Sequence, residues 1–330
     1  MCRATTKSQA KSRHQKSILF LIERSERYTF SGAGFDSCRG RQKMIFIATI
    51  GGLAALIFWG LSDYFGGKSS QNAGPHLTNI VIQFSSVIAL LPIVLFSGID
   101  FNFNLSFVVV MAIAALFTIA YVSFLKSLQI GPYGVAAPVA NSYALITLIV
   151  SLLIFKTQIS GLQLIALIII IIGVIMLAID KTTFHHKKIK GTTAYLAGIA
   201  AIFWGIGFAL MDTVLGDFTW YQLFFLISLW MVIFGSIYYL KEHKKIPKKE
   251  ELTTEKLREA WIAGILITVG SSIFFISLEK TLSVAVPAVI ASASPLVTSF
   301  TAWVKEQERL SVYKRIGAVI IVIGLMLLNV

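Results

Sequence analysis

The heptapeptide ALIFWGL at residues 55–61 returns as AAIFWGI at residues 200–206, with five of seven positions identical and an offset of 145 residues. A second pair, VAAPVANSYALIT (135–147) and VPAVIASASPLVT (286–298), shares five identities at an offset of 151 residues. The last apolar segment of the chain aligns with IIGVIMLAI (171–179) at that same offset. Three matches in the same order predict a chain built from two copies of one unit.

The composition excludes an ordinary soluble protein. Of the 330 residues, 56% are hydrophobic and 14% are charged. Soluble domains usually contain about 25% charged residues, and a single soluble core stops growing near this chain length. Lipid must therefore solvate much of this chain, and intrinsic disorder is excluded by its hydrophobicity.

The first 43 residues differ in character from the rest. Residues 1–43 contain ten Lys or Arg residues and three Asp or Glu residues, which is +7 of the net charge of +13. They also contain both cysteines, Cys2 and Cys38, so the apolar part has no thiol for a disulfide or a metal site. Two interpretations remain: a disordered basic tail, or a mis-assigned translation start with Met44 as the first residue. We favour the second, because the first apolar helix is predicted to begin abruptly at Met44.

Ten segments have about the 20 mostly apolar residues that a transmembrane helix needs. They are 44–66, 77–97, 104–125, 132–155, 162–180, 191–212, 219–240, 259–278, 283–304 and 313–330. The predicted fold is all-α and integral to the membrane, with ten transmembrane helices as two five-helix repeats, 44–180 and 191–330, joined by a charged linker at 181–190. Because five is odd, the second repeat must be inverted relative to the first.

The basic residues predict the orientation. From Met44 onward, the connections on one side of the predicted bundle carry 17 Lys or Arg residues, whereas the other side carries two, Lys156 and Lys280. The positive-inside rule places the basic set in the cytoplasm and both termini outside. The net charge is therefore better explained by topology in a plasma membrane than by nucleic-acid binding.

Several motifs carry a resemblance to a known family. They are AALIFWGLSDYF in the first predicted helix, AAIFWGIGFAL in the sixth, VAVPAVIASASPLVTSFTAWV in the ninth, and then Glu308-Arg309-Leu310 with Gly317 and Gly324. In these residues the chain resembles the EamA-type drug/metabolite transporter superfamily over about 287 of its 330 residues. Thr157-Gln158-Ile159 departs from the Glu-Arg-Leu pattern in the first half. The resemblance implies a basket of ten helices with a central cavity and transport of a small organic solute.

Polar groups in hydrocarbon are costly and normally face the bundle interior or a water-filled cavity. Two predicted helices carry such groups near their middle, beside prolines that free backbone carbonyls. The candidates for the cavity wall are Asn141, Ser142, Tyr143, Ser292 and Ser294, and the candidates for helix breaks are Pro138, Pro287 and Pro295. The alternative is that the small residues there only allow close helix packing.

The repeated tryptophans Trp59 and Trp204 are also candidates, since aromatic faces can hold apolar or cationic substrates. Asp63 follows Trp59 by one helical turn and shares its face. We expect Asp63 within one turn of the cytoplasmic helix end, either as a proton or cation site or as an interfacial carboxylate that faces water or pairs with Lys68. No carboxylate is predicted at a helix midpoint, which favours uncoupled or exchange transport over proton antiport. Weaker candidates are Gln83, Tyr121, Ser271 and Ser272.

No catalytic, ATP-binding or metal-binding motif is found, and His185-His186 has no further ligands at suitable spacing. The chain is therefore predicted to be a secondary transporter rather than an enzyme, with no cofactor or metal. Export of a metabolite or drug is favoured, and the alternatives are an importer or exchanger of sugars or other polar metabolites, or a non-transporting membrane scaffold. The expected partners are a small-molecule substrate and the lipid bilayer but no nucleic acid, and a homodimer is left open.

Overall fold

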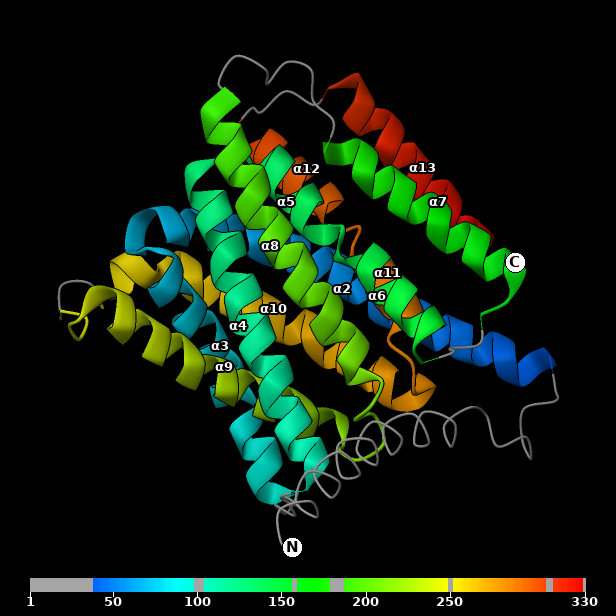
Figure 1. The fold of residues 1–330 in the computed structure, drawn as a ribbon, viewed down its shortest axis with the longest axis horizontal. Coiled ribbons are helices and arrows are strands. Elements are labelled where there is room, and N and C mark those ends of the chain that lie inside the picture. The colour runs from blue at the N-terminus through cyan, green and yellow to red at the C-terminus, as the bar shows by residue number, and fades with distance from the viewer. Residues whose placement is uncertain are drawn as a thin grey trace, which may run out of the picture.

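The computed structural model describes residues 38–97, 104–155, 159–178, 187–248, 252–306 and 311–328, and over these residues it is an all-helical bundle (Figure 1). The helices are α2 (Cys38–Ala73), α3 (Pro75–Phe96), α4 (Leu105–Ile130), α5 (Tyr133–Asn141), α6 (Tyr143–Leu153), α7 (Gly161–Ala178), α8 (Lys187–Met211), α9 (Trp220–His243), α10 (Thr254–Thr281), α11 (Ala285–Ala291), α12 (Pro295–Glu306) and α13 (Val312–Leu328). Among the described residues, eight helical stretches are long and apolar enough to cross a membrane. The chain is a multi-pass membrane protein.

Each of the ten predicted segments contains helix, but two of them are broken. The fourth is divided into α5 and α6, and the ninth into α11 and α12. The segments predicted at 162–180 and 313–330 form the shorter helices α7 and α13, with 18 and 17 residues. The predicted linker at 181–190 is partly helical, because α8 already begins at Lys187.

Helix α2 is longer than predicted at both ends. It begins at Cys38, before Met44, and continues past 66 to Ala73. Gly67 lies inside the helix, where its lack of a side chain makes room for a neighbour. A Cβ atom there would lie 2.4 Å from the Tyr133 ring. The helix ends before Gly74, whose φ of 84° is a left-handed conformation that favours glycine.

The positions of the helix breaks also differ from the prediction. Pro138 and Pro287 lie inside α5 and α11, and the breaks come later, at Ser142 and at 292–294. Pro287 is the third residue of α11, in the first turn, where a missing N–H costs no helical hydrogen bond. Pro295, in contrast, lies at the break itself, as the first residue of α12.

Equivalent residues of the two halves make equivalent contacts. The Thr298 hydroxyl donates a hydrogen bond to the Gly60 carbonyl (3.0 Å), and the Thr147 hydroxyl donates one to the Gly205 carbonyl (3.2 Å). Gly60 and Gly205 are the glycines of the repeated FWG motif, and the two threonines are paired in the second repeat match. The same helix–helix contact is thus built twice, each time between the halves.

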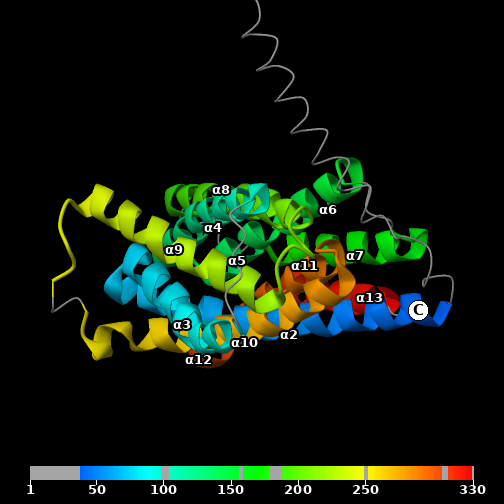
Figure 2. The ribbon, with the colours of Figure 1, turned by 90° about the horizontal axis from the view of Figure 1, so that it is seen from below.

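A further contact is reciprocal. A Cβ atom at Gly173 would lie 2.6 Å from Ile321, and one at Gly324 would lie 2.7 Å from Ile170. Gly173 is equivalent to Gly324, and Ile170 to Ile321, because the members of each pair are 151 residues apart. The glycine of each helix therefore contacts the isoleucine of the other helix. This register requires the two helices to run antiparallel, and both views show them side by side (Figures 1 and 2).

The contact at Gly205 gives a prediction about stability. Its Cβ position lies 2.6 Å from Ile146 and 3.1 Å from the Tyr143 carbonyl, whereas the Cβ position of Gly198 in the same helix has no neighbour within 4 Å. We expect Gly205→Ala to lower the free energy of unfolding by about 1–3 kcal/mol through overpacking. Gly198→Ala is the control, and thermal unfolding of both variants in detergent is the measurement. An equal effect of the two substitutions would contradict the close approach.

Candidate functional site

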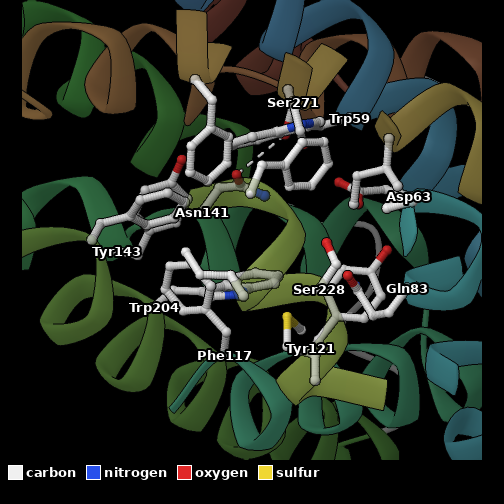
Figure 3. A pocket seen from close by; sticks show the side chains of 18 residues that line it. Trp59, Asp63, Gln83, Phe117, Tyr121, Asn141, Tyr143, Trp204, Ser228 and Ser271 are labelled. Carbon is white, nitrogen blue, oxygen red and sulfur yellow. Dashed lines mark hydrogen bonds between the residues drawn. The ribbon is translucent and has the colours of Figure 1, made fainter. Parts of the chain in front are cut away.

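One cavity lies between the helices of the two halves (Figure 3). Its wall takes residues from α2, α3, α4, α5, α6, α8, α9 and α10 and from the break between α11 and α12. The lining residues are Trp59, Asp63, Gln83, Ser86, Phe117, Tyr121, Asn141, Tyr143, Trp204, Phe208, Phe224, Ile227, Ser228, Met231, Ile267, Ser271, Phe275 and Ser294.

Nine of the twelve residues predicted for the cavity wall lie in this wall: Trp59, Asp63, Gln83, Tyr121, Asn141, Tyr143, Trp204, Ser271 and Ser294. The other three are Ser142, Ser272 and Ser292. Their hydroxyls donate to carbonyls of their own helices, those of Val139, Thr268 and Val289. These three serines satisfy their hydrogen bonds locally and are not among the residues of this cavity wall.

One side of the cavity is aromatic. The rings of Phe208 and Tyr143 stack with centroids 4.9 Å apart, and Phe208 also lies 6.1 Å from the Trp59 ring. The two tryptophans have equivalent neighbours: Trp59 lies 5.0 Å from Phe274, and Trp204 lies 5.2 Å from Phe124. The FWG repeat of the sequence thus places two indole rings at one cavity, from α2 and from α8.

Hydrogen bonds hold the helix breaks together across the halves. The Ser294 hydroxyl donates to Oδ1 of Asn141 (3.2 Å), and the Tyr143 hydroxyl donates to the Ala288 carbonyl (3.2 Å). On the aromatic side, the Trp59 indole N–H donates to the Ser271 hydroxyl (2.9 Å). The polar groups on these residues therefore already have hydrogen-bond partners within the protein.

The opposite side of the cavity offers polar groups without protein partners. Asp63, Gln83, Tyr121 and Ser228 lie there together (Figure 3). Within the described part of the chain, the hydroxyls of Tyr121 and Ser228 have no hydrogen-bond partner. The nearby Ser62 hydroxyl donates instead to the Ala263 carbonyl (2.9 Å). This side can form new hydrogen bonds with a molecule in the cavity.

The surroundings of Asp63 differ from the prediction. It lies ten residues before the end of α2, which is about 15 Å along a helix, not within one turn of it. Its exposed fraction is 6%. Among the described residues, no Lys, Arg or His nitrogen lies within 4.0 Å of its carboxylate, and Lys68 extends over the Tyr64 ring, 5.2 Å from its centroid. The expectation of an interfacial carboxylate paired with Lys68 is therefore wrong.

Like Ser86, Ser228 is a polar lining residue that the sequence interpretation missed. It lies near the middle of the apolar segment 219–240 and is fully buried. The criterion applied to Asn141, a polar group near a helix midpoint, would have found it. Phe117 and Phe208 carry no such signal, because aromatic residues are common throughout these helices.

A bundle of membrane-length helices around a cavity with a polar side and an aromatic side is the architecture of a solute transporter. The profile of the EamA-like transporter family matches residues 46–179 and 192–330, and the chain belongs to this family. The Glu308-Arg309-Leu310 motif lies outside the described residues, as do Thr157, Gln158 and His185-His186.

Two individual proteins are similar to this chain. An uncharacterised transporter from Archaeoglobus fulgidus is 23% identical over 283 residues, which cover 84% of this chain and 95% of that protein. A solved crystal structure superposes with a TM-score of 0.66 at 15% identity, and the alignment covers 85% of this chain and 95% of that one. The likeness to the crystal structure concerns the fold alone. The chain is a membrane transporter.

Proposed function

We propose that this protein is a secondary transporter that moves a small organic solute across the plasma membrane by alternating access, with the cavity as the solute site. The observation that carries the proposal is the position of the cavity on the boundary between the halves. Trp59, Asp63 and Tyr143 come from the first half, and Trp204 and Ser228 come from the second. A relative movement of the halves therefore changes access to the cavity. Export is the direction that the family resemblance favours.

The proposed architecture is ten transmembrane helices as two inverted repeats. Its support is the reciprocal contact of Gly173 with Ile321 and of Gly324 with Ile170, which needs equivalent helices to run in opposite directions. Substrate sites near the midplane between inverted repeats are a general feature of secondary transporters. The two-fold recurrence of the threonine–glycine hydrogen bonds supports the same architecture.

The proposed orientation has the basic loops in the cytoplasm and both termini outside. Three helix ends next to basic connections meet at one end of the bundle: the His76 imidazole contacts the Glu242 carboxylate at 2.8 Å, and the Lys126 ammonium lies 3.7 Å from it. These residues lie at the start of α3, near the end of α4 and at the end of α9. The cluster supports a common side for the three connections.

An importer or exchanger of polar metabolites would use the same movement, so flux direction in oriented vesicles separates it from an exporter. A non-transporting scaffold would have no need to expose the cavity. Proton antiport was disfavoured above because no carboxylate was predicted near a helix midpoint. Asp63 lies ten residues before the end of α2, so proton-coupled exchange is added to the mechanisms to be tested.

Alternating access can be tested without knowing the solute. The chain has two cysteines, both before Met44, so Cys2→Ser and Cys38→Ser give a cysteine-free background. We expect a cysteine at Ser228, which lines the cavity, to react with a membrane-impermeant thiol reagent from either side, in right-side-out and in inside-out vesicles.

The matched control is Ser277→Cys. Ser277 is also buried, but its hydroxyl donates to the Phe274 carbonyl and it lies outside the cavity wall. We expect no reaction at Ser277 from either side. Labelling at Ser228 from one side only, or at the slow rate of Ser277, would exclude alternating access.

A further inference from the structure

We infer that the cavity selects small organic cations with a flat apolar body, that Asp63 is their counter-charge, and that a proton competes with the cation for this carboxylate. The inference rests on the proposed function, because it assigns a substrate class to the same cavity. It adds the charge of the solute and a way in which transport is coupled to protons.

The charges of the cavity wall indicate which charge the solute carries. The 18 lining residues include one acidic side chain, Asp63, and no Lys, Arg or His. A buried carboxylate without a partner is costly, and its partner must be a cation or a proton. Because the wall holds no cationic side chain, an anionic solute would meet no opposite charge there, whereas an ammonium group would complete an ion pair with Asp63.

Helix α12, which follows the second break, does not provide an alternative anion site. The N-terminus of a helix can bind an anion through free backbone N–H groups, and α12 begins beside the cavity residue Ser294. However, Pro295 has no N–H group, and the N–H groups of Leu296 and Val297 donate to the carbonyls of Ala293 and Ser294. The first turn of α12 therefore has no donor left for a carboxylate, which disfavours binding of an anion at this helix end.

The rest of the wall fits the body of such a cation. Trp59 precedes Asp63 by one turn of α2, so an ammonium group at the carboxylate lies beside an indole ring. Aromatic faces attract cations more strongly where water is excluded. The aromatic side, with Trp204, Tyr143 and Phe208, is suited to a flat apolar group, and the partner-free hydroxyls of Tyr121 and Ser228 lie on the polar side.

Proton competition follows from the isolation of Asp63. The other titratable groups of the cavity wall are the phenols of Tyr121 on α4 and Tyr143 on α6, while α3, α5, α8, α9 and α10 contribute none to this wall. Next to Asp63 on α2, Lys68 and Tyr64 contact each other. Since one carboxylate cannot hold a proton and an ammonium group together, cation binding to protonated Asp63 releases the proton, and raising the pH strengthens cation binding until the carboxylate is ionised.

Three probes with the same indole body test the inference: N,N,N-trimethyltryptammonium, tryptophol and indole-3-acetate. The first is a permanent cation, so pH acts on the protein alone, the second is neutral, and the third is an anion. Binding to the purified full-length chain in detergent is measured by isothermal titration at several pH values. We expect the cation to bind at least about tenfold more tightly than tryptophol, since charge pairing in a dry site exceeds that in water. Its affinity should rise with pH, with release of up to one proton, over the pH range in which Asp63 is protonated before the cation binds.

The variant Asp63→Asn should remove the preference for the cation, the pH dependence and the proton release, while tryptophol still binds. Glu279→Gln is the matched control, because this carboxylate lies near the end of α10 and outside the cavity wall. It should retain all three properties. Retained tryptophol binding reports that Asp63→Asn is folded, and the pH profile of the unsubstituted protein tests the inference without any substitution.

Equal binding of cation and alcohol, tightest binding of indole-3-acetate, no binding of any probe, or an unchanged cation preference in Asp63→Asn would each overturn the inference. None of these results would affect the cysteine reactivity at Ser228, which uses no solute. Failure of the substrate class is therefore distinguishable from failure of alternating access.

Discussion

A disulfide bond between cysteines introduced at Asn141 and Ser294 is expected to reduce transport at least about a hundredfold. Asn141 ends α5 in the first half, Ser294 lies in the break before α12 in the second half, and their side-chain oxygens are 3.2 Å apart. A covalent bond there prevents the halves from separating at the cavity, and alternating access needs that movement. The measurement is flux into liposomes of the solute that gives the highest signal in a broad panel, after oxidation and again after reduction.

The control pair is Ser69→Cys with Thr78→Cys, both in the first half, where the two hydroxyls are 2.9 Å apart. This pair links the end of α2 to the start of α3 and does not cross between the halves. Its oxidation should leave the flux nearly unchanged, with mass spectrometry verifying both disulfides. Full flux through the oxidised Asn141–Ser294 protein would show that this contact persists throughout transport.

The second large effect is expected for Trp204→Ala. The Trp204 ring lies 5.2 Å from Phe124 and 5.9 Å from both Tyr121 and Tyr143, so its removal leaves a void between α4, α6 and α8. Replacing a packed tryptophan by alanine typically costs about 3–5 kcal/mol. Because Trp204 is partly buried and lines the cavity, we expect the free energy of unfolding to fall by about 2–3 kcal/mol, below this range, together with weaker binding of any solute that uses the aromatic side.

Trp303→Ala is the matched control for Trp204→Ala. Its side chain is 46% exposed on the surface of α12 and contacts Phe300 on the same helix. Because lipid can replace a ring on the surface, Trp303→Ala should lower the thermal unfolding temperature much less. A comparable loss for both variants would mean that Trp204 contributes no more than a surface ring to the stability of the bundle.

Much of the site could be predicted because motifs and spacing within each helix already indicate which side chains share a face. The FWG repeat identified both tryptophans, and the four-residue spacing placed Asp63 on the face of Trp59, where the structure also has it. Asn141 and Tyr143 were found because polar groups in the hydrocarbon region normally face the bundle interior or a cavity. The same criterion did not select cavity residues at Ser142 and Ser292, since a serine just after a helix can donate to a carbonyl three residues before it.

The sequence by itself determined the all-helical membrane fold and showed the repeated FWG motif, because hydrophobic length and repetition are visible along the chain. The tertiary structure alone decided where α2 ends, where the broken helices are interrupted and how little of the Asp63 side chain is exposed. Those features depend on neighbours distant in the chain, such as the Tyr133 ring that occupies the space over Gly67. The distance of a carboxylate from its counter-charges is likewise a property of packing, and no pattern within one helix records it.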